Sequence, residues 1–284
     1  MNIHCIHHDD LDGRCSAAIV AYVYSKTFRW TVNFIEANYD TILNFDGIQN
    51  NDVVYIVDFS LQEDMMKSLM EKTKRIVWID HHDTAKNYSY YYLDGLRDFG
   101  EKSSAACELT WRFFFPDEDL PIPVMLIGDY DKWALLHAPK CFEFYEGMKM
   151  IDHSPTAPIW GVAFSSINPE YFNTITDMGK TAIKYRDEYC KDMTIRFGYE
   201  VEIAGIKGFA TNLIGFGSGA FANKMDEYDF CASYVHNGKF FKFSLYSKKV
   251  DVSEICKKYG GGGHTGAAGF SSETLPWKII ETTK

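Results

Sequence analysis

Short apolar runs alternate with amphipathic stretches along the first half of the chain. Four runs have the length and composition of strands: residues 3–8, residues 30–34 (where Trp30, Val32 and Phe34 alternate with polar residues), 53–57 and 76–79. The last two are continuously apolar, as is typical of strands buried on both faces of a parallel sheet. Helical patterns lie between and after them, at residues 14–25, 61–73 and 103–115, the last opened by a serine pair suited to an N-cap. This alternation predicts a parallel sheet with helices on both faces.

The pattern changes beyond residue 165. Residues 170–196 carry apolar side chains near helical spacing and predict a connecting helix. Hairpin patterns follow, with Asn237-Gly238 as a turn signal, and a short helix at 252–259 leads into four glycines, of which Gly260 is suited to a helix C-cap. We therefore expect an α/β fold in three parts: an N-terminal parallel-sheet domain over residues 1–165, a connecting helix or linker over 166–198, and a smaller α/β domain over 199–284.

The chain is acidic overall. Its 284 residues include 39 Asp and Glu against 29 Lys and Arg, and the resulting net charge of −10 repels a long polyanion. We therefore exclude long duplex nucleic acid as a partner and expect a short anionic substrate, which metal ions can hold against the background charge. The seven cysteines form no CxxC pair, and no apolar run reaches the length of a membrane span. We expect a reduced, cytoplasmic protein without a membrane partner.

Acidic residues and histidines gather where the apolar runs end. Four segments share this position: His7-His8-Asp9-Asp10-Leu11-Asp12-Gly13, Asp58, Asp80-His81-His82-Asp83, and Asp129-Tyr130-Asp131 after the apolar run 124–127. Ligands of parallel α/β sheets bind at the carboxyl ends of the strands, and carboxylates crowded there repel one another unless cations neutralise them. Mixed His and Asp ligands suit Mn, Zn or Fe better than Ca, and two ions would share one bridging carboxylate. A single Asp after a strand is more often a cap or turn residue, and we assign Asp9, Asp52 and Asp83 to that class.

Five segments, in this order, resemble the motifs of the DHH phosphoesterases. The segment from His8 to Gly13 resembles their H-x-D-x-D-G opening motif, and Asp80-His81-His82 resembles the triplet that names the family. Asp58 and Asp129 are similar to its two isolated aspartates. The segment from Gly260 to Phe270 resembles the GGGH-x-x-AAG signature of the associated C-terminal domain. The resemblance covers nearly the whole chain and implies a catalytic N-terminal domain and a substrate-binding C-terminal domain.

The resemblance also implies roles for individual residues. One metal ion would be held by His8, Asp10 and Asp58, and a second by Asp12, Asp58, His81 and Asp129, with Asp58 as the bridge. The implied catalytic residues are His82, which would face the substrate phosphate, Asp80 and Asp58. The resemblance also implies that His82 binds substrate. The backbone N–H groups of Gly261, Gly262 and Gly263 can cradle phosphate oxygens, and His264 adds a donor. Trp133 lies where the chain departs from the family's fourth motif and is a candidate wall for a base or ribose. His7 stays a rival to His8, because adjacent strand residues point to opposite faces, and Asp131 stays an additional candidate ligand.

The implied chemistry is hydrolysis at phosphorus by a water molecule that two divalent ions activate. We expect manganese, with magnesium, cobalt or zinc as alternatives. The expected substrates are phosphodiester bonds of short oligoribonucleotides or signalling nucleotides. A phosphoanhydride hydrolase similar to pyrophosphatases and exopolyphosphatases is one alternative, and a catalytically inactive nucleotide-binding module is another. Tyr246 stands where relatives commonly place an arginine, and whether the chain forms a homodimer stays open.

Overall fold

The structure is a computed structural model that describes residues 1–25, 31–39, 41–100, 102–165, 169–213, 215–221 and 224–280. Trp30, part of a predicted strand, lies outside these ranges. The chain divides into two compact units, Met1–Ala182 and Ile183–Lys284. The border between them falls inside α7 (Pro169–Phe197), which confirms the predicted connecting helix.

Four parallel strands form the sheet of the first unit, in the order β2-β1-β3-β4. The strands are β1 (Ile3–His8), β2 (Val32–Ala37), β3 (Val53–Val57) and β4 (Arg75–Ile79). The central strands β1 and β3 are buried along almost their whole length. Both faces of the sheet are covered, which is why β3 is continuously apolar in the sequence. The predicted parallel sheet is confirmed.

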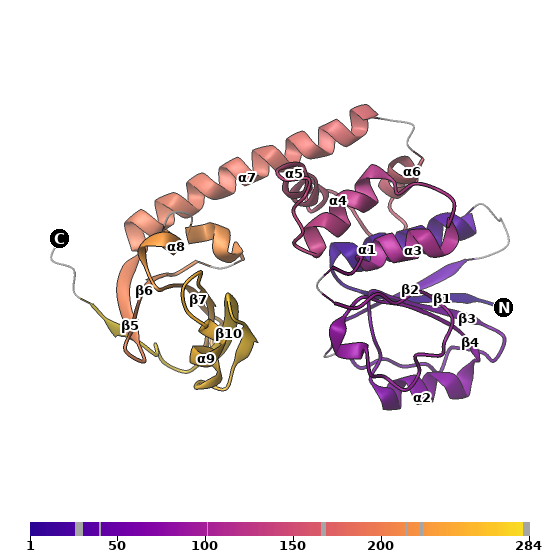
Figure 1. Cartoon of the computed structure of the whole chain (residues 1–284), viewed down its shortest axis with the longest axis horizontal. Coiled ribbons are helices and arrows are strands. Elements are labelled where there is room, and N and C mark those ends of the chain that lie inside the picture. Colours follow the sequence, from indigo (N-terminus) through magenta and orange to yellow (C-terminus); the bar gives the residue numbers. More distant parts are fainter. Residues whose placement is uncertain are drawn as a thin grey trace. The chain divides into compact units, whose positions relative to one another are not determined.

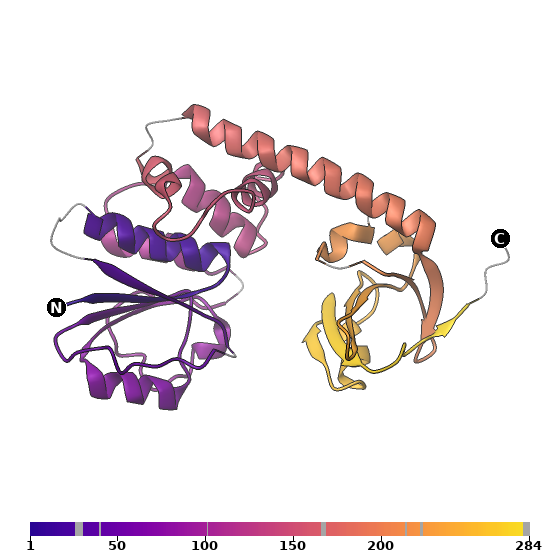
Figure 2. The same cartoon turned by 180° about the vertical axis from the view of Figure 1, so that it is seen from behind.

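Helices cover both faces of this sheet, as Figures 1 and 2 show. They are α1 (Leu11–Ser25), α2 (Glu63–Lys72) and α3 (Ala106–Phe114). Helices α1 and α3 lie on one face and α2 on the other. Successive residues of β1 point to opposite faces, so Cys5 packs in one core with Ala17 of α1, while Ile6 packs in a second core with Met66 of α2.

Helix α3 begins at Ala106, three residues later than predicted, and the predicted serine cap is wrong. Ala105 occupies the N-cap position and has no capping side chain. Instead, the carboxylate of Asp12 accepts hydrogen bonds from the backbone N–H of Ala106 (2.9 Å) and of Cys107 (2.8 Å). A residue of α1 therefore satisfies the free N–H groups at the start of α3, a tertiary contact that the local sequence does not reveal.

The apolar run 124–127 belongs to a helix and not to a strand. The helix is α4 (Ile122–Asp131), and it packs with α5 (Lys140–Met148) and α6 (Pro158–Phe164) in an all-helical part of the unit. Val124, Leu126 and Ile127 are all buried. A helix buried on most sides is apolar all round, so a short piece of it has the same composition as a buried strand.

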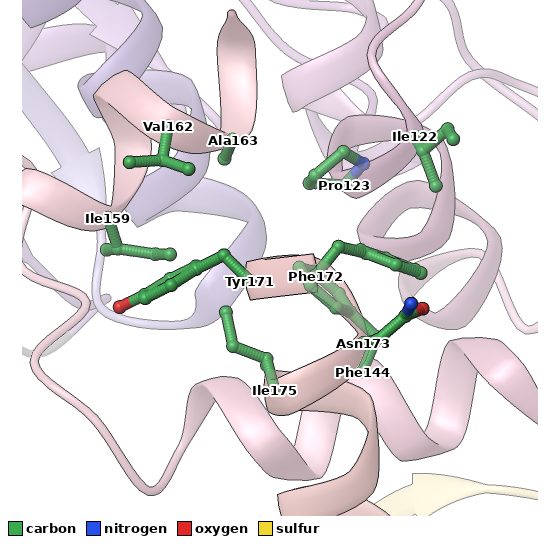
Figure 3. A pocket seen from close by; sticks show the side chains of 10 residues that line it. All are labelled: Ile122, Pro123, Phe144, Ile159, Val162, Ala163, Tyr171, Phe172, Asn173 and Ile175. Atoms are coloured by element: carbon green, nitrogen blue, oxygen red, sulfur yellow. The ribbon is translucent and has the colours of Figure 1, made fainter. Parts of the chain in front are cut away.

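A cavity of about 320 Å³ lies among these helices and the start of α7 (Figure 3). Pro123 of α4, Val162 of α6 and Phe172 of α7 face one another around it. Among the described residues that line it there is no acid, histidine or cysteine. The described residues that line the cavity therefore offer no group of metal ligands.

The second unit is built on a seven-stranded mixed sheet in the order β11-β5-β6-β7-β8-β10-β9. The strands are β5 (Tyr199–Ile203), β6 (Ile206–Thr211), β7 (Phe230–His236), β8 (Phe241–Tyr246), β9 (Gly262–His264), β10 (Ala267–Ser272) and β11 (Lys278–Ile279). Neighbours β6 and β7 are parallel, and the other pairs are antiparallel. The predicted turn at Asn237-Gly238 joins β7 to β8, with Gly238 at φ +95°.

Short helical elements complete the fold. They are η1 (Asp83–Ala85), η2 (Gly217–Phe221), α8 (Lys224–Glu227) and α9 (Val252–Lys257). Helix α9 ends before Gly260, which adopts the left-handed conformation (φ +76°) in the turn that follows. None of the described helices combines the length and the apolar composition needed to cross a bilayer.

Candidate metal centre

The histidines and aspartates at the strand ends meet at the carboxyl edge of the N-terminal sheet. His8 ends β1, Asp58 follows β3, and residues 80–82 follow β4. Three groups of side chains have ligand atoms within 4.8 Å of one another: His8, Asp10 and Asp58; Asp12, His81 and Asp131; and Asp58, His81 and His82. Each group has the mixed nitrogen and oxygen donors that suit a divalent transition metal.

Asp58 belongs to two of these groups and turns one oxygen toward each side. Its Oδ2 lies 3.8 Å from Nδ1 of His8, and its Oδ1 lies 3.1 Å from Nε2 of His81. The residue is 1% exposed. Within the part of the chain that the structure describes, Oδ2 is buried and accepts no hydrogen bond. A buried carboxylate oxygen without a donor is costly, and a cation between Asp58 and His8 would satisfy it.

The second group uses Asp131 where the motif resemblance implied Asp129. Nε2 of His81 lies 3.7 Å from Oδ2 of Asp12 and 3.5 Å from Oδ2 of Asp131. The Asp129 carboxylate instead accepts the backbone N–H groups of Leu136 and His137, each at 2.8 Å. Because both aspartates lie on α4, two positions along a helix place them about 200° apart around its axis. The structure therefore leaves Asp129 outside the three groups.

His8, and not His7, faces the cluster. The ring of His7 is 1% exposed, donates a hydrogen bond from Nδ1 to the His8 carbonyl oxygen (2.7 Å) and packs edge-on against Phe34. None of the three groups includes it. Asp52 is a turn residue, as predicted, because it accepts the backbone N–H of Gln49 (2.9 Å).

Asp10 and Asp12 combine metal-ligand geometry with helix capping. Oδ1 of Asp10 accepts the N–H of Gly13 in the first turn of α1 (2.9 Å), and its Oδ2 lies 2.8 Å from Nδ1 of His8. Asp12 accepts two N–H groups at the start of α3. The positive ends of two helices therefore point at the cluster and help to hold its negative charge.

Gly13 is required because α1 begins against the end of β1. A Cβ atom at this position would lie 2.5 Å from the carbonyl oxygen of His8 and 2.8 Å from its Cβ. No side chain fits at that distance. This close approach explains why a glycine follows Asp12 in the opening motif and why His8 and Asp10 can meet.

Asp80 positions the other residues of its triplet. Its Oδ1 accepts the backbone N–H of His81 (2.8 Å) and lies 2.7 Å from Nδ1 of His82, while its Oδ2 accepts the hydroxyl of Ser60. None of the three ligand groups includes Asp80. Burial disfavours protonation of His82, but the hydrogen bond and the charge of Asp80 outweigh it and raise the pKa of His82.

Without a cation, the carboxylates of the cluster oppose one another. Burial and then the charges of Asp12 and Asp10 raise the pKa of Asp58 well above its usual range. Burial and the charge of Asp10 raise the pKa of Asp12 to about 6, and burial and the charge of Asp12 raise that of Asp131 to about 7. Asp10 differs: although burial acts against ionisation, its hydrogen bonds with His8 and Gly13 lower its pKa to about 2. The donor set and its crowded charge fit divalent cations.

The predicted substrate-binding residues lie in both units. Trp133 follows α4 with φ +53° and is 60% exposed, and it packs edge-on against Tyr130 and Phe142.

In the second unit, a Cβ at Gly261 would lie 2.1 Å from the Gly269 carbonyl oxygen. A Cβ at Gly263 would likewise lie too close to β10, and its φ of +141° disfavours other residues. Steric crowding therefore requires glycine at both Gly261 and Gly263. At Gly262 a Cβ would meet nothing within 4 Å, and both Gly262 and His264 are exposed. Their contact with substrate stays a prediction.

The sequence analysis missed an aromatic residue at the cluster. Tyr39 follows the end of β2, and its ring lies 5.9 Å from that of His8 and 6.3 Å from that of His82. The run ending at Ala37 is a fourth strand end of the same sheet, but a tyrosine after it does not indicate a site until its exposure is known.

Comparisons with known proteins bear on the N-terminal part of the chain and on its fold. The model of the DHH family, N-terminal domain, matches residues 2–128. An uncharacterised protein of Acanthamoeba polyphaga mimivirus is 24% identical over 244 residues, which are 80% of this chain and 54% of that protein. The chain therefore spans about half the length of this relative.

Several solved structures share the fold at low sequence identity. The DHH domain of a member of a ribosomal protein family matches with a TM-score of 0.62 at 15% identity, covering 98% of this chain and 83% of the other. Exonuclease RecJ bound to manganese matches with a TM-score of 0.56 at 11% identity, covering 95% of this chain and 85% of the other. PggH of Vibrio cholerae, a pGpG-specific phosphodiesterase, matches with a TM-score of 0.53 at 12% identity, covering 96% of this chain and 94% of the other. These likenesses bear on the fold and confirm the expected α/β class.

Proposed function

We propose that the protein is a metal-dependent phosphoesterase, because the model of the DHH family, N-terminal domain, matches its residues 2–128. Its substrates would be phosphodiester bonds of short oligoribonucleotides or of signalling nucleotides. The observation that carries the proposal is the position of Asp58, whose two oxygens face two different groups of His and Asp ligands. A shared carboxylate between two groups is the arrangement that dinuclear hydrolases use.

Residues of this chain would divide the work of the site. His8 and Asp10 would hold one cation with Asp58, and Asp12, His81 and Asp131 would hold the other with the second oxygen of Asp58. We propose manganese for both positions, which agrees with the manganese-bound RecJ structure of the same fold. Two such ions supply an activated water near neutral pH and stabilise the oxygens of an in-line displacement at phosphorus.

His82 would bind the phosphate. Asp80 fixes its ring through Nδ1 (2.7 Å), and the hydrogen bond and the charge of Asp80 raise the pKa of His82. A doubly protonated ring would donate from Nδ1 to Asp80 and keep Nε2–H for a phosphate oxygen. Asp80 also accepts the Ser60 hydroxyl and the His81 N–H and belongs to none of the three ligand groups, so it would hold His82 and not a cation.

A short substrate agrees with the charge of the chain. The net charge of −10 disfavours long duplex nucleic acid, while a substrate of one to three nucleotides would meet mainly the cations and His82. PggH, of the same fold, acts on the dinucleotide pGpG. All seven cysteines are buried and free, which suits a reducing compartment, and we propose the cytoplasm without a membrane partner.

The proposal is tested by product analysis with Mn²⁺ present. A 5′-labelled dinucleotide, a labelled trinucleotide, a cyclic dinucleotide and pyrophosphate are incubated side by side with the protein and with its Asp58→Asn variant. We expect mononucleotide products from at least one of the nucleotides, and none with the variant. Release of phosphate from pyrophosphate, with every nucleotide left intact, would replace the proposal by a phosphoanhydride hydrolase.

A further inference from the structure

Tyr39 lies at the edge of the sheet where the proposed metal ligands lie. Strand β2 runs parallel to β1, and its last residue, Ala37, is paired with His8. Tyr39 follows two residues later, so its position is set by the same strand ends that place the cluster. The adjoining Asn38 fixes the turn, because its Oδ1 accepts the Tyr39 N–H (2.8 Å) and its Nδ2 donates to Asp9 (3.0 Å).

The ring of Tyr39 stands beside the two histidines that matter for the chemistry. Ring centroids lie 5.9 Å from His8 and 6.3 Å from His82, the second contact being edge-on at 84°. Phe59 supports the ring at 5.2 Å and 34°. Phe59 is 4% exposed, whereas Tyr39 keeps 54% of its surface exposed. A buried ring therefore supports an exposed one at the border of the cluster.

An exposed aromatic ring at this place has a chemical consequence. Inorganic phosphates offer it nothing to pack against, since they are small, charged and fully hydrated. A nucleotide carries a planar base beside its phosphate, and bases stack on exposed tyrosine rings regardless of their sequence. The adjoining turn is hydrogen-bonded, so little conformational freedom would be lost when a base stacks there.

We propose that Tyr39 is a stacking surface for a base of the substrate, beside the phosphate that the cluster cleaves. The inference rests on the proposed phosphoesterase function and narrows its substrates to molecules that carry a nucleobase. Tyr39 would act through its ring and not through its hydroxyl. It would therefore contribute to substrate selection and not to metal binding.

The kinetic test compares a dinucleotide with its abasic analogue, which has the same sugar–phosphate chain without bases. For Tyr39→Ala we expect kcat/KM on the dinucleotide to fall by about 5- to 150-fold, the range that loss of base stacking produces. The rate on the abasic analogue should stay within about twofold of the wild type. Tyr39→Phe should retain wild-type rates on both. Tyr92→Ala is the matched control, because Tyr92 is 76% exposed and its hydroxyl contacts Met70 of α2.

A binding measurement separates this inference from the proposed function. The probe is a non-hydrolysable dinucleotide that contains 2-aminopurine, whose fluorescence is quenched on stacking. We expect quenching with the wild type and Tyr39→Phe, and little with Tyr39→Ala. Equal quenching by the Ala variant, an equal loss of rate on the abasic analogue, or a loss in Tyr39→Phe as large as in Tyr39→Ala would overturn the stacking role. Quenching by a wild-type protein that cleaves only pyrophosphate would support stacking and refute the phosphodiesterase proposal.

Discussion

Replacing Asp58 by Asn should abolish stabilisation by Mn²⁺ without destabilising the metal-free protein. Asn keeps the shape of the side chain and tolerates the left-handed backbone at this position, where φ is +53°. In the metal-free wild type, burial and the neighbouring carboxylates raise the pKa of Asp58 and favour its neutral form, which the amide resembles. With Mn²⁺ present, both ligand groups lose the charged oxygens that they share.

The size of the effect follows from binding linkage. A ligand at 100 times its Kd stabilises the folded state by about 2.7 kcal/mol. For the 182 residues of the unit Met1–Ala182, this corresponds to a rise in Tm of about 5–10 °C for one site. We expect a gain of at least this size when millimolar MnCl2 is added to the wild type. For Asp58→Asn, differential scanning fluorimetry should show a Mn²⁺-dependent rise in Tm of less than about 2 °C. The metal-free Tm of this variant should equal or exceed that of the wild type.

Asp129→Asn is the matched control, and it should show the opposite pattern. Asp129 accepts two backbone N–H groups, and an amide NH₂ in place of one oxygen leaves a buried donor without an acceptor. The loss should be about 1–3 kcal/mol, which lowers the metal-free Tm by several degrees. Its Mn²⁺ gain should match the wild type. If Asp129→Asn lost the Mn²⁺ gain and Asp58→Asn kept it, the arrangement of the cluster described here would be refuted.

Three further outcomes test other parts of the site. His82→Ala should keep the Mn²⁺ gain in Tm but lower dinucleotide turnover by about 10²–10³-fold, because it removes a hydrogen-bond donor to the phosphate. Unchanged turnover in steady-state assays would contradict this role. Gly13→Ala should destabilise the metal-free protein by about 1–3 kcal/mol through the clash with the end of β1, measured by urea unfolding. Gly47→Ala, where a Cβ meets nothing within 4 Å, should be neutral by comparison. The Mn²⁺ gain in Tm should be largest near pH 8 and fall toward pH 6, because Asp12 and Asp131, with pKa values raised to about 6 and 7, take up protons in competition with the cation. The Tm of the metal-free protein should instead rise toward pH 6, because ionisation of groups with raised pKa values destabilises the metal-free fold. A Mn²⁺ gain that does not vary with pH would be inconsistent with these carboxylates as ligands.

The N-terminal sheet could be predicted because its strands carry a strong local signal. A continuous apolar run such as 53–57, bounded by polar residues and alternating with helical patterns, is typical of a strand that is buried on both faces. The residue after such a run lies at the carboxyl edge of the sheet, which is how Asp58 and His81 could be expected to meet. Helix α7 could also be predicted from the sequence, because its apolar residues recur at helical spacing over many turns.

The choice between Asp129 and Asp131 could not be made from the sequence. The preceding apolar run has the composition of a strand and of a buried helix, and the two conformations turn neighbouring aspartates in different directions. The cap of α3 was hidden for a related reason, since its acceptor, Asp12, belongs to a different helix. Tyr39 also follows a strand end of this sheet, but an aromatic residue there does not indicate a binding site until its exposure is known.

Local pattern alone therefore determined the strands of the N-terminal sheet and the long helix α7, and that histidines and aspartates gather at one edge of a parallel sheet. The tertiary structure decided which oxygen of Asp58 faces which histidine, which aspartate of α4 joins them, and which tyrosine stands beside them exposed. The division has a physical cause: burial and periodicity are properties of a short segment, whereas the direction of a side chain and its partners depend on contacts between residues far apart in the chain.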